Sequence, residues 1–202
     1  MKKFLTIGAI AGLLASLTAP AQAIPGESVD EVKAWMQGHP TLRATENERL
    51  QVQRTETPAR RYIFRATIFP IGGTDGNSDT PAILNRGLDR TQIRVETFML
   101  VDTVDGVDYE DLEEALRVIY GPDLYADYRR STSTRLYPVS SPARLLRPNR
   151  SDARGQVREG EAYGYWLELI PNPDGTVHTG SISVLLPEDI DQLQSHLEQT
   201  GR

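Results

Sequence analysis

The three histidines of this chain are its most obvious candidates for acid–base chemistry. His39 lies between Gly38 and Pro40, His178 follows a predicted turn, and His196 lies on a predicted C-terminal helix. A serine hydrolase needs a nucleophilic serine, a histidine base and an orienting acid. No serine here lies in the G-x-S-x-G pattern of a nucleophile elbow. We therefore interpret the histidines as structural or solvated residues.

Metal-binding patterns in the sequence are incomplete. Residues 75–79 (DGNSD) begin like a calcium loop, with oxygen ligands at the first, third and fifth positions. Such a loop also requires glycine at its sixth position and glutamate at its twelfth, where this chain has Thr80 and Arg86. The chain contains neither an H-E-x-x-H motif nor any cysteine. We predict no metal site and no cofactor.

Paired carboxylates could still act as general acid and general base. The chain has 28 aspartates and glutamates, and glycoside hydrolysis needs two carboxyl groups on either side of one bond. Because separation in space is not visible in a sequence, a cofactor-free hydrolase that uses such carboxylates stays the alternative to a non-enzymatic function. We predict no particular catalytic residue.

Charge is segregated in the second half of the chain. Residues 102–127 contain nine acidic residues and one arginine, whereas residues 129–158 contain eight arginines and one acidic residue. One interpretation is that the two blocks neutralise each other in the fold or lie on solvated faces. The other is that the arginine segment binds an acidic protein or another anionic surface, because guanidinium groups bond carboxylates and phosphates in pairs. The candidate contacts are Arg144, Arg147, Arg150, Arg154 and Arg158.

Three aromatic residues near position 165 form a further candidate site. In a strand, Tyr163 and Tyr165 share one face and Trp166 points to the other. Their ordinary role is packing beneath helices or sheet. The alternative is an exposed aromatic platform for a sugar or a peptide.

The elements that position these residues begin with a short helix over residues 29–37. Ser28 and Glu31 have the spacing of a capping box, and Gly38 supplies a C-terminal stop. A helix this short is not stable alone and must pack on something. We expect Trp35, on its apolar face, to be buried and to anchor it on a sheet.

Alternation of apolar and polar residues predicts strands over residues 49–54, 60–69 and 91–101. The strongest hairpin signal covers residues 161–186, where Pro173-Asp174-Gly175 has the composition of a tight turn. These connections are short and local. They predict antiparallel pairing.

Two more helices are predicted, one from Asp108 to Gly121-Pro122 and one that begins after Pro187. Both of the first two helices end at Gly and Pro, which indicates either a twofold repeat or ordinary helix termination. Residues 138–160 are rich in arginine and proline and are predicted to be a long irregular segment. Without β-α-β alternation, the fold class is α+β: a single domain with a mostly antiparallel sheet and two to three short helices packed on it.

The N-terminal residues and the overall composition indicate where the protein works and which partners are excluded. Residues 1–23 have the positive end, the apolar run and the Ala-Gln-Ala cleavage site of a secretory signal peptide. We predict a domain over residues 24–202 that is extracytoplasmic, in a periplasm or a thylakoid lumen or secreted, with no transmembrane segment. Without Lys2 and Lys3, 20 basic residues face 28 acidic ones, which argues against nucleic acid as a partner.

Residues 24–43 (IPGESVDEVKAWMQGHPTLR) and residues 57–66 (TPARRYIFRA) resemble exported proteins of unassigned function from cyanobacteria. The resemblance implies a periplasmic or lumenal setting and no site residues. The sequence as a whole therefore favours a non-enzymatic binding or accessory module that contacts a protein or an anionic surface.

Overall fold

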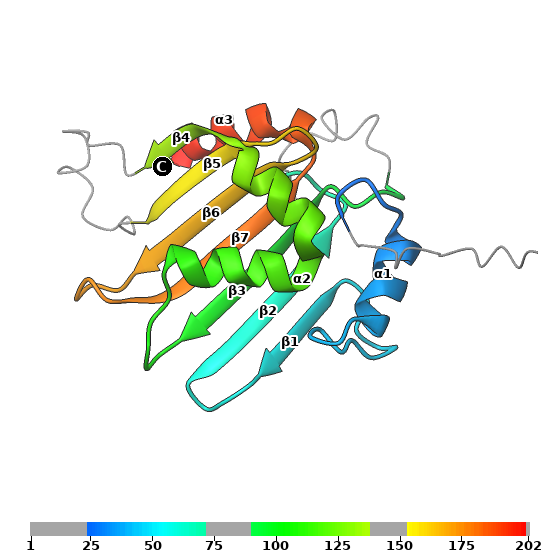
Figure 1. Ribbon diagram of the computed structural model, residues 1–202, viewed down its shortest axis with the longest axis horizontal. Coiled ribbons are helices and arrows are strands. Elements are labelled where there is room, and N and C mark those ends of the chain that lie inside the picture. The colour runs from blue at the N-terminus through cyan, green and yellow to red at the C-terminus, as the bar shows by residue number, and fades with distance from the viewer. Residues whose placement is uncertain (1–23, 72–89, 138–152, 201–202) are drawn as a thin grey trace, which may run out of the picture.

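The computed structural model describes residues 24–71, 90–137 and 153–200 (Figure 1). Within these ranges the fold is α+β, as predicted, with one seven-stranded antiparallel sheet and three α-helices. The strands are β1 Gln51–Thr55, β2 Arg60–Thr67, β3 Val95–Asp102, β4 Thr132–Tyr137, β5 Arg154–Glu159, β6 Gly164–Pro171 and β7 Val177–Leu185.

The sheet joins two groups of strands at its centre. Its spatial order is β1-β2-β3-β7-β6-β5-β4, and every neighbouring pair is antiparallel. β1 to β3 are consecutive in the chain, as are β4 to β7. The long-range pairing of β3 with β7, in which Phe98 lies opposite Ile182, unites the two groups.

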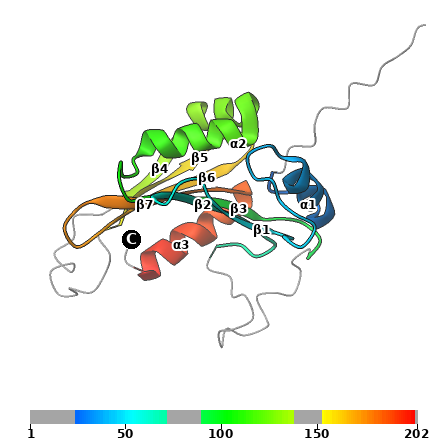
Figure 2. The same cartoon turned by 90° about the horizontal axis from the view of Figure 1, so that it is seen from below.

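The two faces of the sheet are covered by different helices (Figure 2). Strand alternation sends Phe98 and Leu100 of β3 toward α2 (Tyr109–Arg130), where they join the larger core cluster. Val95 belongs to the smaller cluster, which contains Leu193 and Leu197 of α3 (Ile190–Thr200). The core is therefore divided into two layers by the sheet.

Helix α1 (Val29–Gly38) matches the predicted helix closely. Both hydrogen bonds of the Ser28–Glu31 capping box form. Val32 and Met36 are fully buried, and Trp35 is partly buried, with its ring 5.7 Å from that of Phe64. Trp35 thus packs the helix against β2, although it is less buried than expected.

Helix α2 extends beyond the end predicted for it at Gly121-Pro122. Asp108 caps its start in a second capping box, as the sequence indicates, but the helix continues through Gly121-Pro122 to Arg130 with a kink. Gly121 has φ 79° and ψ −175°, a conformation open to glycine alone. Proline at the first position of a helix sacrifices no hydrogen bond. The Gly-Pro pair therefore ends one helical segment and begins another.

The predicted irregular segment over residues 138–160 is wrong at its C-terminal end. Residues 154–159 form strand β5, and the unpredicted β4 pairs with it. β5 shows no clear apolar alternation because one of its inward positions is Gly155, where a Cβ atom would lie 2.2 Å from the Tyr137 hydroxyl. Residues 138–152 lie outside the described residues, as do the predicted signal peptide and residues 75–79.

Among the described residues, none of the helices has the length and apolar character needed to cross a bilayer.

Candidate functional site

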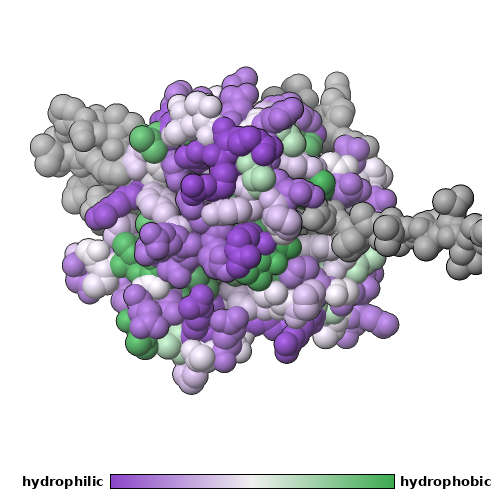
Figure 3. All heavy atoms as spheres, in the orientation of Figure 1, coloured by the Kyte–Doolittle hydropathy of each residue, from purple (hydrophilic) through white to green (hydrophobic). Residues whose placement is uncertain are grey.

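A groove lies between the first half of α2 and strands β2 and β3, with a volume of about 150 Å³. A cavity of this size holds one benzene-sized group. We call it the α2 groove. Its apolar floor and sides are formed by Tyr62, Phe98, Leu100, Ala115, Val118 and Ile119, and its polar lining by Thr41, Glu56, Arg60, Asp111 and Glu114. Figure 3 shows apolar (green) surface exposed beside polar side chains on this face of the molecule.

The floor of the α2 groove is held by ring stacking and by the sheet register. Tyr62 of β2 lies opposite Leu100 of β3, and the rings of Tyr62 and Phe98 stack with their centroids 5.3 Å apart. The Tyr62 hydroxyl donates a hydrogen bond to the carbonyl oxygen of Thr41. Burial raises the pKa of this hydroxyl, so it stays a donor at neutral pH. The floor is thus held in place by contacts within the protein.

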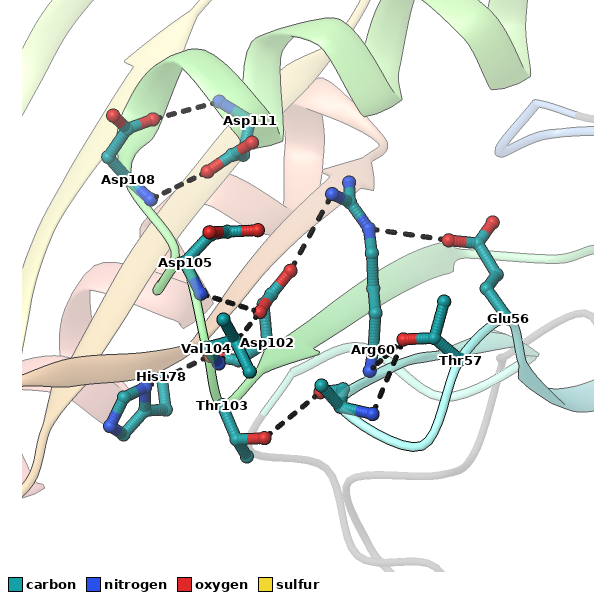
Figure 4. Close-up of polar contacts among 11 residues, drawn as sticks. Glu56, Thr57, Arg60, Asp102, Thr103, Val104, Asp105, Asp108, Asp111 and His178 are labelled. Carbon is teal, nitrogen blue, oxygen red and sulfur yellow. Dashed lines mark hydrogen bonds and ion pairs between the residues drawn. The ribbon is translucent and has the colours of Figure 1, made fainter.

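Arg60 is the cation of the groove, and two carboxylates hold it. It begins β2 opposite Asp102, the last residue of β3. Its Nη1 lies 3.6 Å from Oδ2 of Asp102, and its Nε lies 3.3 Å from Oε2 of Glu56 (Figure 4). Its positive charge is therefore already shared between two acidic side chains.

Asp102 has a structural role at the end of β3. Its Oδ1 accepts hydrogen bonds from the backbone N–H groups of Val104 and Asp105, each at 3.0 Å. These bonds hold the pKa of Asp102 below its usual value. The backbone carbonyl of Asp102 accepts a hydrogen bond from Nδ1 of His178 at 3.0 Å (Figure 4). His178 thereby ties β7 to the end of β3, from which the chain leads into α2.

His39 is also a structural histidine, as the sequence indicates. Its Nε2 lies 3.2 Å from the carbonyl oxygen of Ile119, so Nε2 carries the proton. Its Nδ1 accepts from the backbone N–H groups of Thr41 and Leu42, both at 3.2 Å. Burial lowers the pKa of His39 and keeps the ring neutral. The ring thus ties α2 to the segment that supplies Thr41 to the groove.

The two acidic residues that α2 contributes are already engaged at the helix surface. Asp111 accepts from the backbone N–H of Asp108 at 3.0 Å in the capping box. Both carboxylate oxygens of Glu114 accept from Arg117, at 2.5 and 2.7 Å, which lowers the pKa of Glu114. The described residues contain no group of three or more His, Cys, Asp or Glu side chains placed to hold a metal ion.

Glu96 is the most unusual polar residue, and sequence reasoning missed it. It lies on the α2 side of β3, is 0% exposed, and is followed on that face by the apolar residues Phe98 and Leu100. Within the described residues, neither its carboxylate oxygens nor the buried Tyr120 hydroxyl have a hydrogen-bond partner of good geometry. Burial raises the pKa of Glu96 to about 8. The signal was visible as a lone glutamate in the stretch VETFML.

The predicted arginine contacts are only partly described by the structure. Arg144, Arg147 and Arg150 lie outside the described residues. Arg154 is exposed on β5, three strands away from β3 in the sheet.

Arg158, the fifth predicted contact, is engaged within the molecule. Its Nη2 and Nε donate to the backbone carbonyl and the hydroxyl of Ser131 at 2.6 and 2.8 Å. Its guanidinium also lies 5.1 Å from the centre of the Tyr128 ring. The structure does not bring Arg154 or Arg158 to the α2 groove.

The two charge blocks meet at one ion pair among their described residues. Arg129 of the arginine block lies 3.5 Å from Glu113 of the acidic block, and the Tyr128 hydroxyl donates to the same carboxylate at 2.9 Å. Both contacts lie within α2. The described part of the arginine block therefore pairs with only one residue of the acidic block.

The aromatic residues around position 165 are packing residues where the structure describes them. Tyr165 is fully buried in the larger core and donates to Oδ2 of Asp127 at 2.7 Å. Trp166 packs on the opposite face and donates to the Tyr137 hydroxyl at 2.7 Å. Tyr163 is partly buried against the larger core. The ordinary interpretation, packing on both faces, fits these contacts better than an exposed platform.

Comparison with protein-family models, curated proteins and solved structures found no match. The interpretation of the α2 groove therefore rests on its geometry and chemistry.

Proposed function

We propose that the protein is a non-enzymatic binding module that holds an apolar group of a partner protein in the α2 groove. The observation that carries this proposal is an apolar pocket of about 150 Å³, bordered by charged side chains and built on helix and strand residues. An apolar pocket with a few polar groups at its edge is the usual form of a binding site. Internal contacts that already order the floor favour binding, because less conformational entropy is then lost when a ligand enters.

The state of the acidic side chains favours binding over hydrolysis. A general acid needs a raised pKa and contact with the substrate. Hydrogen bonds lower the pKa of Glu114, which lines the groove, and of Asp102, which holds its arginine. Glu96 has a raised pKa but is fully buried, so it cannot touch a substrate. A carboxylate hydrolase is therefore the weaker of the two proposals.

The signal peptide predicted for residues 1–23 would place this binding in an extracytoplasmic compartment. The arginine segment would then supply a second, electrostatic contact with the same partner. Of the five candidate contacts, Arg154 is the described one whose side chain is exposed.

Filling the groove tests the proposal. Ala115 lines the groove from α2, and Ala115→Leu adds three carbon atoms there with only a small loss of helix propensity, which the Ala126→Leu control shares. Ala126→Leu is the matched control, because Ala126 is a similarly half-buried alanine on α2 that does not line the groove. Partners are captured from an extract of the native source on wild-type protein and identified, and their affinities are then measured with purified components.

We expect Ala115→Leu to weaken binding at least tenfold and Ala126→Leu to leave it unchanged. Thermal unfolding of both variants shows whether either change has disturbed the fold. Equal affinity of wild type and a folded Ala115→Leu for every captured partner would refute the groove as the binding site.

A further inference from the structure

We infer that the group bound in the α2 groove carries a positive charge next to its apolar part, as a partner segment does when a lysine or arginine adjoins an aromatic or aliphatic side chain. This inference rests on the proposed function and specifies its ligand. Its basis is the balance of charge around the groove.

The apolar part of the ligand follows from the floor. Tyr62, Phe98 and Leu100 present rings and methyl groups from the sheet, and Ile119 faces them from α2. Val118, which is 46% exposed, adds apolar surface at the edge of the groove. A ring or branched aliphatic group of benzene size fills this space.

The positive charge follows from the polar lining. Glu56, Asp111 and Glu114 carry three negative charges against the single positive charge of Arg60. Two of these residues have ion-pair partners outside the lining: Asp102 pairs with Arg60, and Arg117 pairs with Glu114. These partners add one negative and one positive charge, so the excess of two negative charges does not change. A cation that approaches the groove is therefore attracted, and an anion is repelled.

Arg60 does not make the groove an anion site. Its guanidinium already has carboxylate oxygens at 3.3 and 3.6 Å, from Glu56 and Asp102. An incoming carboxylate would have to compete with both and would add a third negative charge beside them. An incoming ammonium or guanidinium group can instead approach Glu56, whose side chain is 48% exposed.

Three probes of similar size separate charge from apolar contact. 3-Phenylpropylammonium, 3-phenylpropanol and 3-phenylpropionate share one ring and chain and differ in their terminal charge. Each is titrated into the ¹⁵N-labelled protein at low ionic strength while the backbone amide signals of Thr41, Val118 and Ile119 are followed by NMR. These three residues line the groove.

We expect the ammonium probe to bind about fivefold more tightly than the alcohol, and the carboxylate more weakly than the alcohol. The ammonium preference should diminish in 0.5 M salt, because the charges lie at the surface. Glu56→Gln should reduce the preference, whereas Glu46→Gln, an exposed glutamate that does not line the groove, should retain it.

The outcomes separate this inference from the proposed function. If the alcohol or the carboxylate shifts the same amides with equal or higher affinity, the charge inference is wrong and the groove remains a binding site. If none of the three probes shifts these amides, both the inference and the proposed function are wrong.

Discussion

Glu96 places a carboxyl group inside the apolar core between the sheet and α2. With a pKa of about 8 in the folded state, against an ordinary value of 4.5, it is protonated at neutral pH. Between these two values the folded protein holds a proton that the unfolded chain releases. The contribution of Glu96 to the free energy of unfolding is therefore most favourable below pH 4.5. It decreases as the pH rises toward 8.

Replacing Glu96 tests this proton linkage. Because of Glu96, the unfolding free energy of the wild type should fall by up to about 1.4 kcal/mol for each pH unit between 5 and 8. This is the largest slope that the release of a single proton can produce. Glu96→Gln, which cannot ionise, should remove that slope and exceed the wild type in stability at pH 8. Urea unfolding at pH 5, 6.5 and 8 measures the slopes, with the exposed Glu46→Gln as control. Parallel wild-type and Glu96→Gln profiles would contradict the prediction.

Arg158 and Arg154 form a matched pair on β5, one bonded within the protein and the other exposed. Arg158→Ser removes the donors to the buried Ser131 carbonyl and the contact with the Tyr128 ring. We expect it to lower the unfolding free energy by about 1–3 kcal/mol. Arg154→Ser should change it by less than about 0.5 kcal/mol. Urea melts of the two variants measure both values, and equal losses would show that Arg158 is not specifically structural.

The residues of the α2 groove could not be predicted from the sequence, and the reason is physical. The groove brings together Thr41, Arg60, Phe98 and Ala115, which are distant in the chain and have no diagnostic spacing. Each is an ordinary strand, loop or helix residue by itself. Only the sheet register and the position of α2 make them neighbours. The three histidines, by contrast, lacked any catalytic pattern, and two of them prove to be bonded to backbone carbonyls.

At the scale of elements, the prediction agrees with the structure where a helix or strand is specified by nearby residues, through a helix cap or through alternation of apolar and polar residues. The Ser28–Glu31 capping box and the Asp108 cap are local in sequence, and they mark the starts of α1 and α2 correctly. The alternation of Tyr62, Phe64 and Ala66 likewise marks β2, because these residues face the core. β4 was missed because it is an edge strand with mostly exposed side chains, so its pattern carries little hydrophobic signal.

The kink in α2 depends on a glycine. Gly121→Ala forces a side chain into a backbone conformation with φ 79° and should lower the unfolding free energy by about 1–3 kcal/mol. Gly38→Ala is the control, since a methyl group added to Gly38 at the end of α1 would meet nothing within 4 Å. It should be neutral or slightly stabilising.

Differential scanning calorimetry of both glycine variants measures the difference. A Gly121→Ala protein as stable as Gly38→Ala would mean that α2 can straighten at no cost.

At the scale of the whole molecule, the bend in α2 determines where the sheet is covered. The second half of α2 is tied to the β5–β6 turn, because Asp127 accepts hydrogen bonds from the backbone N–H groups of Glu161 and Ala162. The first half crosses the centre of the sheet (Figure 1). The α2 groove lies along this first half, on the side of β2, and the bend turns the rest of the helix away from it.

The antiparallel architecture follows from short local connections, which is why the fold class could be predicted. The placement of β7 between β3 and β6 could not, because no local pattern in the sequence specifies which strand pairs with β3. That pairing joins residues that are far apart in the sequence, such as Phe98 and Ile182.

The central position of β7 also determines when the sheet can form during synthesis of the chain. β7 ends at Leu185, close to the end of the described chain, yet it is the strand that joins the two groups. Until it has been made, β3 and β6 each have an unpaired edge, and the sheet cannot close across its centre. The chain must therefore be synthesised as far as Leu185 before the native sheet can form, which predicts slow folding and exposure of the edges of β3 and β6 to aggregation or chaperones until then.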